Sequence, residues 1–494
     1  MNGNGKNVVL FPFMAQGHLN PFLDLARLFA FRAPSLTITF VSTPANNLSL
    51  RPRFLSYPTI RFLDLSFHID GDPPLPDNAE NTDVFTTQSY ISRFYLGSES
   101  LFRHSFHRLI SQITESDGGR PPVCIISDMF LAWTIDFAHS FGSLHIPLYT
   151  SGPYAMSIYN SIWTHLPHTL TCSDVFTLPD VPGITLHRTQ LSNNMKAASK
   201  DKRSSEFVKR QADCCRRSDG SLWNTVEVLE KSSLHNWAQS TGKPVWAIGP
   251  LLPRSCDEHE RGGKRPGLSP EACIEWLNLH PPNSVLYVSF GSQNSVTVAQ
   301  MKELANGLEQ SGRPFIWALR NPTGFDGRES FREEWLPDGF QERMKDSKHG
   351  LLVHNWAPQI DILSHTSTGA FLSHCGWNSV LESLGRGVPI IGWPLAAEQF
   401  YNSKLLEEEL GACMELARGS DAIVEGGDVA RIVRLVMEGE EGEEMRRKAK
   451  GLREEMKMAV MEGDGQRGSS LRAFDDFVET LILRCDKSEK PERE

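Results

Sequence analysis

Apolar runs rich in β-branched residues alternate with stretches of helical spacing through the first half of the chain. Such runs are typical of buried strands, and strands separated by helices predict a parallel sheet. After the first run, Asn20 followed by Pro21 predicts the start of a helix. The predicted strands of this half are residues 8–13, 36–43, 123–128 and 146–151.

The same alternation restarts in the second half of the chain. Thr297 and Gln300 form a predicted capping box for a helix that begins near residue 298, and the polar segment 322–334 is predicted to be a loop. We therefore predict an α/β fold with two doubly wound domains, which bind ligands at the carboxyl ends of their strands. The predicted strands of this half are residues 284–290, 314–319, 351–354, 368–373 and 388–393.

An abrupt change in composition separates the two halves, because a stretch rich in charge, Gly and Pro intervenes. Such a stretch is typical of an exposed linker. Near the end, an apolar stripe from Leu471 to Ile482 predicts a helix, which we expect to pack back on the N-terminal domain. The expected limits are 1–250 for the N-terminal domain, 251–270 for the linker, 271–465 for the C-terminal domain, 466–484 for the last helix and 485–494 for a charged tail.

The composition argues against several classes of protein. At 494 residues, with 40% hydrophobic and 22% charged residues, the chain is expected to be globular and long enough for two domains. A net charge of -10 argues against nucleic-acid partners, whose phosphates require clustered Lys and Arg. Because no run of 18 apolar residues occurs, we predict no membrane span.

The cysteines and the N-terminus bear on the compartment. The nine cysteines are odd in number and form no CxxC pair, which is typical of reduced thiols rather than of disulfides or a zinc site. The residues before the apolar run Val8–Phe13 carry too little positive charge for a signal peptide, and the run itself is too short. We therefore expect a cytoplasmic protein. We also expect it to be a monomer.

Residues 356–399 combine side chains that suit a ligand with a base, a ribose, a diphosphate and a sugar. A predicted strand ends there in a glycine turn, and a helix follows from Trp377 to Arg386, whose first N–H groups and positive dipole end form an anion site. Each side chain alone has an ordinary structural explanation, but their joint spacing indicates a ligand. The candidates are Trp356 for the base, His374, Gly376, Asn378 and Ser379 for the diphosphate, Glu382 for the ribose, and Glu398 and Gln399 for the sugar.

Two residues of the first half are candidates for acid–base chemistry. His18 lies in the predicted loop between the first strand and the first helix, where the helix N-terminus keeps an imidazole neutral. Asp128 ends a predicted strand and is either a helix N-cap or a carboxylate that orients a base. Together they predict a general base with an orienting partner.

The block 356–399 closely resembles the plant secondary-product glycosyltransferase box of plant UDP-dependent glycosyltransferases. The resemblance extends to PFMAQGHLNP, PPVCIISD, CIEWLNLHPPNSVLYVSFGSQ and LPDGFQER, and so covers essentially the whole chain. It implies the GT-B arrangement, in which two Rossmann-like domains face each other across a cleft. The C-terminal domain would hold the UDP-sugar, and the N-terminal domain would hold a small-molecule acceptor.

The resemblance also implies a role for each matching residue. His18 would be the catalytic base and Asp128 its partner, and Glu398 stands where the family commonly has Asp. The donor contacts that it implies are Trp356, Ala357 and Gln359 at the uridine, Glu382 at the ribose, His374, Asn378, Ser379 and Ser292 at the phosphates, and Trp377, Glu398, Gln399 and Thr150 at the sugar.

The implied reaction is an inverting displacement that moves glucose from UDP-glucose to an acceptor and needs neither a metal nor a cofactor. The acceptor is expected to be a lipophilic plant metabolite with a hydroxyl or carboxyl group, a phenolic or flavonoid before a terpenoid or steroid. Segments 64–100 and 153–220 are expected to line its pocket. The candidate apolar wall residues, each of which has a plain core role as the alternative, are Leu65, Phe67, Phe85, Phe94, Tyr95 and Phe130.

Three other functions compete with this interpretation. A dinucleotide-dependent oxidoreductase would carry GxGxxG after the first strand, where this chain lacks it, and a serine hydrolase would carry GxSxG, which does not occur. A non-catalytic sugar-nucleotide-binding protein would be favoured by loss of His18 or Asp128, and both are present.

Overall fold

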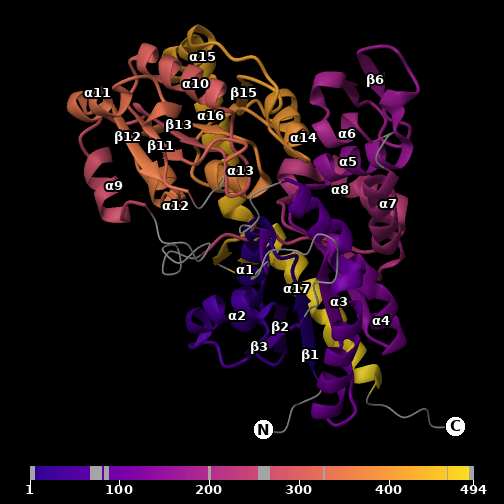
Figure 1. Cartoon of the computed structure of the whole chain (residues 1–494). Helices are drawn as coiled ribbons and strands as arrows, with labels where there is room; N and C mark the ends of the chain where they lie inside the picture. Colours follow the sequence, from indigo (N-terminus) through magenta and orange to yellow (C-terminus); the bar gives the residue numbers. More distant parts are fainter. Residues whose placement is uncertain are drawn as a thin grey trace, which may run out of the picture. The chain divides into compact units, whose positions relative to one another are not determined.

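The computed structural model describes residues 6–66, 80–82, 88–198, 202–253, 267–325, 329–463 and 465–488. The chain forms two compact units (Figure 1). Unit 1 comprises Met1–Pro153, Asp201–Leu252 and Met458–Glu494, and unit 2 comprises Tyr154–Lys200 and Pro253–Lys457. The predicted domain and linker limits stay predictions, and residues 254–266 of the predicted linker lie outside the described residues.

Unit 1 is built on a seven-stranded parallel sheet in the order β3-β2-β1-β4-β5-β8-β9. All four strands predicted for this half are confirmed, each within two residues at either end. The sequence did not predict β3, which is half exposed, or β8 and β9, which have three residues each. The strands are β1 (Asn7–Phe11), β2 (Thr37–Ser42), β3 (Ile60–Asp64), β4 (Cys124–Asp128), β5 (Leu144–Tyr149), β8 (Ser221–Trp223) and β9 (Val245–Ala247).

Helices cover both faces of the sheet of unit 1 and bury the apolar residues of each face. The last helix is amphipathic as predicted, and Phe474, Phe477 and Leu481 of its stripe are fully buried. The helices are α1 (Gln16–Arg32), α2 (Pro44–Leu50), α3 (Gln88–Ser116), η3 (Met129–Thr134), α4 (Ile135–Ser140), α7 (Lys202–Arg217), α8 (Glu227–Thr241) and α17 (Ser469–Ser488).

The predicted start of the first helix is wrong. Helix α1 begins at Gln16, so Pro21 lies inside it and His18 lies in its first turn instead of in a loop. The backbone N–H groups of His18 and Leu19 both donate to Ala15 O, at 2.9 and 2.8 Å. Burial of Leu19 in the core outweighs the local signal of Asn20-Pro21.

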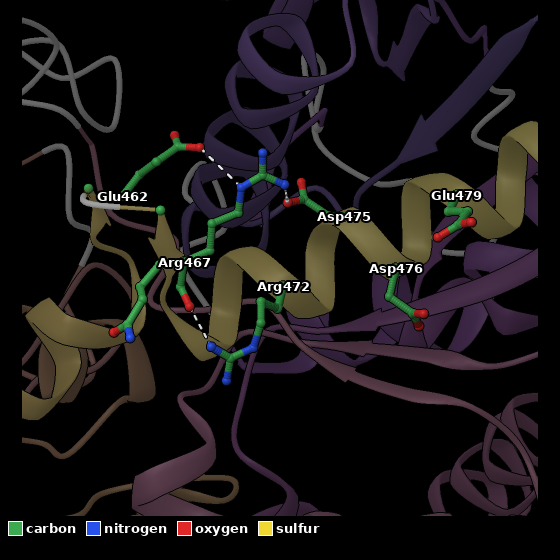
Figure 2. Close-up of a pocket in the computed structure, with 9 residues that line it drawn as sticks. Glu462, Arg467, Arg472, Asp475, Asp476 and Glu479 are labelled. Carbon is green, nitrogen blue, oxygen red and sulfur yellow. Dashed lines mark hydrogen bonds and ion pairs between the residues drawn. The ribbon is translucent and has the colours of Figure 1, made fainter.

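Helix α17 also makes ion pairs with the other end of α1. The Arg32 guanidinium donates to both carboxylate oxygens of Asp475, at 3.0 and 2.9 Å, and the Phe29 and Phe474 rings lie 5.0 Å apart. A small hairpin, β16 (Glu462–Gly463) with β17 (Gln466–Arg467), precedes α17. Between them lies a pocket of about 700 Å³ (Figure 2).

Unit 2 is built on a six-stranded parallel sheet in the order β12-β11-β10-β13-β14-β15. All five strands predicted for this half are confirmed. The order repeats the arrangement of unit 1, in which the first and fourth strands of the sheet lie side by side at its centre. The strands are β10 (Val285–Ser289), β11 (Phe315–Leu319), β12 (Gly350–His354), β13 (Thr368–Ser373), β14 (Ile390–Gly392) and β15 (Cys413–Glu415).

The helices of unit 2 cover both faces of its sheet, as in a doubly wound fold. The capping box is confirmed, since Thr297 Oγ1 accepts from Gln300 N at 3.2 Å and Gln300 Oε1 accepts from Thr297 N at 2.9 Å. The helices include α5 (Pro153–His165), α6 (Asn193–Lys196), α9 (Pro270–Leu277), α10 (Val298–Ser311), α11 (Phe340–Ser347), α12 (Gln359–Ser364), α13 (Trp377–Leu384), α14 (Gln399–Lys404), α15 (Gly426–Glu438) and α16 (Glu440–Ala459).

Candidate active site

The structure brings His18 and Asp128 together at the carboxyl ends of the two central strands of unit 1. Strands β1 and β4 are neighbours in the sheet, so the turn after each emerges at the same edge. His18 Nδ1 lies 2.7 Å from Asp128 Oδ2, and the Asp128 side chain is fully buried while that of His18 is 21% exposed. A base with an orienting carboxylate is therefore present as a geometry, as the sequence predicted.

Asp128 performs two tasks with its two oxygens. Oδ1 accepts a hydrogen bond from Phe130 N at 2.9 Å and so caps helix η3, while Oδ2 faces His18. The cap fixes the carboxylate in the direction of the imidazole. Because a carboxylate only accepts, the neutral ring carries its proton on Nδ1 and has its acceptor at Nε2.

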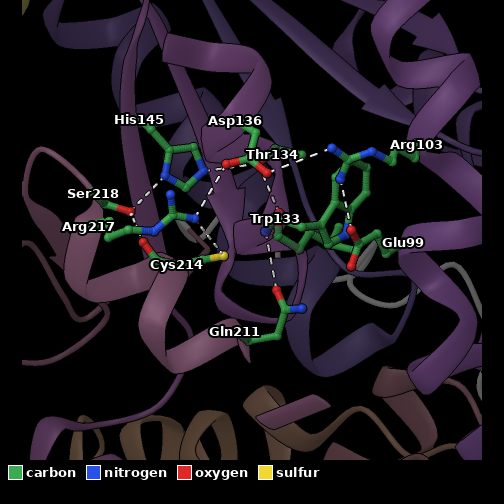
Figure 3. A network of polar contacts seen from close by, with 11 residues as sticks. Glu99, Arg103, Trp133, Thr134, Asp136, His145, Gln211, Cys214, Arg217 and Ser218 are labelled. Carbon is green, nitrogen blue, oxygen red and sulfur yellow. Dashed lines mark hydrogen bonds and ion pairs between the residues drawn. The ribbon is translucent and has the colours of Figure 1, made fainter. Parts of the chain in front are cut away.

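A buried polar network holds the far end of η3 (Figure 3). His145 Nε2 lies 2.9 Å from Thr134 Oγ1 and 3.1 Å from Ser127 Oγ, and its Nδ1 lies 2.8 Å from Ser218 Oγ. Burial lowers the pKa of His145 to about 3, so this ring stays neutral and serves as a structural hydrogen-bonding group. The helix that Asp128 caps is therefore fixed at both ends.

Aromatic rings surround the His18 imidazole. The Phe130 ring centroid lies 5.3 Å from that of His18 and the Phe13 centroid 5.6 Å, and Tyr95 lies 4.7 Å from Phe130. Phe130, which was predicted to contact the acceptor, therefore lies beside the predicted base. Phe207 extends this wall, since its ring lies 4.4 Å from Tyr95.

The other predicted wall residues divide into two groups. Leu65 and Phe94 are fully buried in the core of unit 1, so the plain core alternative describes them. Phe67 and Phe85 lie outside the described residues. Thr150, predicted at the donor sugar, has its Oγ1 3.2 Å from His18 Nδ1 and so lies beside the dyad.

In unit 2 four predicted donor residues, together with Arg320, which the sequence did not predict, follow five adjacent strands at one edge of the sheet. In sheet order, Trp356 follows β12, Arg320 follows β11, Ser292 follows β10, His374 follows β13, and Gln399 lies after β14. Since the strands are parallel, these positions share the carboxyl edge. The predicted base and sugar contacts therefore lie on opposite sides of the predicted phosphate contacts.

His374 is held between two glycines at the centre of this edge. A Cβ added at Gly291 would lie 2.6 Å from the imidazole, and one added at Gly376 would lie 2.5 Å from Nε2. Gly291 also has a φ of 77°, which favours glycine. Burial, and secondly the charge of Arg320, lower the pKa of His374 to about 4, so the ring is neutral at physiological pH.

The helix predicted at Trp377 begins there, with Gly376 as its N-cap. Asn378 and Ser379 therefore lie in the first turn of α13, where its N–H groups are available to an anion. The preceding residue, Cys375, has a φ of 61°, and Asn402 Nδ2 donates to its carbonyl at 3.0 Å. A left-handed conformation at a non-glycine residue costs about 1 kcal/mol and is maintained by such surrounding contacts.

Gln359 links the predicted uridine and ribose contacts. Its Nε2 donates to Glu382 Oε2 at 2.6 Å and to Ser379 Oγ at 3.1 Å, and its Oε1 accepts from Tyr287 OH at 3.2 Å. The amide therefore orients Glu382 one turn into α13. Trp356 is half-buried just before α12, and Ala357 beside it is buried.

Of the residues of unit 2 that are predicted at the sugar, Glu398 and Gln399 lie at the start of α14, and Trp377 is buried in α13. Glu398 is the N-cap of α14. Gln399 Oε1 accepts from Leu395 N at 3.0 Å and from Ala396 N at 2.9 Å. The loop backbone therefore occupies both acceptor positions of Gln399 Oε1, and the donor of this side chain is its Nε2.

Sequence reasoning missed Phe13, Phe207, Gly291 and Arg320. Phe13 and Gly291 stand within motifs that were noticed, PFMAQGHLNP and SFGS, so their proximity to His18 and His374 had a local signal. Phe207 and Arg320 had none, because their contacts cross between separate elements. Their roles come from the fold alone.

Other features of the described residues bear on function. The residues that line the pocket beside α17, all within 462–479, include none of the predicted site residues, and many of their charged side chains pair with one another. Within the described ranges, no group of three His, Cys, Asp or Glu side chains is placed to hold a metal ion. Likewise, no described helix has the length and apolar character to cross a membrane.

Comparison with known proteins identifies the family. Residues 267–444 match the family model described as UDP-glucoronosyl and UDP-glucosyl transferase. The chain is 43% identical over 445 residues to crocetin glucosyltransferase 3 of Crocus sativus, covering 88% of this chain and 92% of the relative.

Solved structures agree with the sequence relatives. UGT73P12 of Glycyrrhiza uralensis, complexed with glycyrrhetinic acid 3-O-monoglucuronide, has a TM-score of 0.83 at 28% identity, with 98% of this chain and 97% of that one covered. UGT2 of Phytolacca americana, complexed with UDP-2fluoro-glucose and pterostilbene, has a TM-score of 0.75 at 26% identity, with 97% and 100% covered. The chain therefore belongs to the plant UDP-dependent glycosyltransferases and is a UDP-glycosyltransferase with the GT-B fold.

Proposed function

We propose that the enzyme transfers glucose from UDP-glucose to a hydroxyl group of a small phenolic or flavonoid metabolite, with inversion, giving a β-glucoside and UDP. The contact of 2.7 Å between His18 and Asp128, enclosed by aromatic rings, is the observation that carries this proposal. A carboxyl acceptor would use the same arrangement.

The dyad supports a direct displacement. His18 Nε2 takes the proton from the acceptor hydroxyl as its oxygen attacks the anomeric carbon, and UDP leaves from the opposite side. Asp128 keeps the ring in the reactive tautomer and stabilises the imidazolium that forms. The proposed reaction uses no metal, because the start of α13 offers N–H groups, a positive dipole end and the Ser379 hydroxyl to the departing diphosphate.

The aromatic wall supports a flat phenolic acceptor over a terpenoid or steroid. The Phe130 ring lies 4.7 Å from that of Tyr95 and 5.8 Å from that of Phe13, and such rings offer faces and edges to a further ring. For the donor, the glucosyltransferase names of relatives such as the Crocus sativus enzyme favour glucose. The residue types of Trp377 and Gln399, which match the predicted sugar contacts, favour the same donor.

Acceptor and donor panels test this proposal with purified full-length protein. UDP-glucose, UDP-galactose and UDP-glucuronate compete in the presence of a phenol, a flavonoid, a terpenoid alcohol, a steroid alcohol or an aromatic carboxylic acid. The expected result is transfer of glucose to the phenol or flavonoid. Preference for another donor, or turnover confined to the terpenoid or steroid, would overturn the corresponding part.

His18→Ala tests the mechanism. The kcat of the variant should fall about 10²- to 10⁴-fold while its affinity for UDP stays that of the wild type, because the base acts on the acceptor and not on the nucleotide. His235→Ala, which changes an exposed histidine of α8, is the matched control. Turnover of His18→Ala near the wild-type rate would rule out the dyad.

A further inference from the structure

Arg320 lies at the centre of the donor edge although no motif pointed to it. It directly follows β11, the neighbour of β10 in the sheet, and its Nη1 donates to Gly291 O at 3.0 Å. Gly291 begins the turn that carries Ser292. The guanidinium is therefore attached to the backbone of a predicted phosphate-binding turn.

The same turn contacts His374 on its other side. Gly291 has no room for a side chain because the imidazole lies against it, and the charge of Arg320 is the second cause, after burial, of the lowered pKa of that ring. Arg320, the glycine turn and His374 thus form one cluster across β11, β10 and β13. A positive charge close enough to lower the pKa of the imidazole also attracts an anion bound beside that ring.

The predicted phosphate contacts are otherwise uncharged. His374 is neutral at physiological pH, and Ser292, Asn378 and Ser379 carry no charge. When the glycosidic bond breaks, its electron pair moves to the diphosphate oxygen and the leaving UDP gains negative charge. Hydrogen-bond donors and half a unit of helix-dipole charge compensate this less well than a guanidinium does.

We propose that Arg320 is a positioning residue for the nucleotide diphosphate, which holds the Gly291–Ser292 turn through its carbonyl and supplies the formal positive charge of this edge. The inference rests on the proposed location of the UDP diphosphate at the β10 and β13 ends. It predicts a residue that discriminates UDP from uridine, since only UDP carries phosphates.

Calorimetric titration of full-length protein with UDP and with uridine tests the role. Arg320→Gln keeps an N–H donor for the Gly291 carbonyl and removes the charge, whereas Arg320→Lys keeps the charge. We expect Arg320→Gln to weaken UDP binding about tenfold and uridine binding less than about twofold. The UDP affinity of Arg320→Lys should lie between those of the wild type and Arg320→Gln. Arg434→Gln removes a surface arginine that also donates to a backbone carbonyl, Gln310 O, and should change neither affinity.

Each other outcome contradicts the inference in a recognisable way. Equal weakening of UDP and uridine by both variants would assign Arg320 a purely structural role, and unchanged UDP binding by Arg320→Gln would remove it from the site. A wild type that binds uridine as tightly as UDP would remove the diphosphate from this edge, and the inference with it. Failure to glucosylate phenolic acceptors, with UDP still preferred over uridine, would overturn the proposed function alone.

Discussion

The two sheets place different chemistry at corresponding positions. In both units the two central strands end side by side, β1 and β4 in one and β10 and β13 in the other. The first pair carries His18 in contact with a buried carboxylate, and the second carries His374 between glycines and near an arginine. The same kind of sheet thus carries the proposed base in unit 1 and a neutral histidine in unit 2.

The neighbours of each ring explain the difference. In the proposed reaction, the carboxylate 2.7 Å away stabilises the imidazolium that forms on His18, and the ring is 21% exposed, as contact with an acceptor requires. Burial and a nearby positive charge disfavour protonation of His374, which remains a neutral hydrogen-bonding group. The position in the fold is shared, and the partner side chain determines the function.

The substitution in this comparison with the largest expected effect breaks the contact between His18 and Asp128 in unit 1. Asp128→Asn keeps an oxygen for the η3 cap but presents an N–H donor to His18, which favours the wrong tautomer. We expect kcat to fall about 10² to 10³-fold, with UDP affinity unchanged. In a double mutant with His18→Ala the defects should not multiply, because the residues act as one unit. Independent losses measured by steady-state kinetics would show that the two residues do not cooperate.

The substitution with the next largest expected effect disturbs the packing of His374 against Gly291 in unit 2. Gly291→Ala places a methyl group 2.6 Å from the His374 ring at a φ of 77°, so the turn or the ring must move. UDP affinity should fall about tenfold or more, which corresponds to about 1.4 kcal/mol or more. Gly183→Ala is the control, since Gly183 also has a positive φ, of 84°, but no atom lies within 4 Å of the added Cβ. Equal affinities in the two variants would remove the turn from the donor site.

A smaller effect sharpens the description of the sugar end. Gln399→Glu preserves an acceptor for Leu395 N and Ala396 N and replaces the Nε2 donor by an acceptor. The KM for UDP-glucose should rise about five- to tenfold, as expected for one lost hydrogen bond, while UDP affinity stays the same. An unchanged KM would place the sugar away from Gln399.

The smallest effect concerns pH. Because the folded-state pKa of His374 is about 4 and the unfolded value is near 6.5, the unfolded chain binds more protons between these values. Stability from this group is present above pH 6.5 and is lost as the pH falls toward 4, by about 1 kcal/mol between pH 6.5 and 5.5. Denaturant unfolding at the two pH values should show this loss in the wild type and a smaller one in His374→Gln. Identical losses would contradict a neutral buried His374.

The sequence predicted most of what local patterns specify. Long β-branched runs identified nine strands, and the spacing of residues 356–399 identified a strand, a glycine turn and the helix from Trp377. It did not predict β8 and β9, because three-residue strands are defined by their neighbours and not by their own pattern. The start of α1 was wrong because core packing outweighed a proline signal.

At the candidate site, residue types were predictable and their contacts were not. The sequence named His18 and Asp128, but the two oxygens of Asp128 acquire separate tasks only once η3 folds beside β4. The sequence named Gln399, but only the structure shows that the turn before α14 occupies its acceptor. Arg320 could not be predicted, because its contact with Gly291 depends on the pairing of β10 with β11.

The contact between Arg32 and Asp475 has a consequence for biosynthesis, since the two residues are 443 positions apart. At about 5 to 20 residues per second, a ribosome needs roughly 20 to 90 s to travel from one to the other. During that time α1, whose first turn contains His18, has been made, but the helix that packs on Phe29 has not. The first domain to be translated is therefore among the last to complete its core, and a premature stop before α17 would leave the earliest part of the chain exposed.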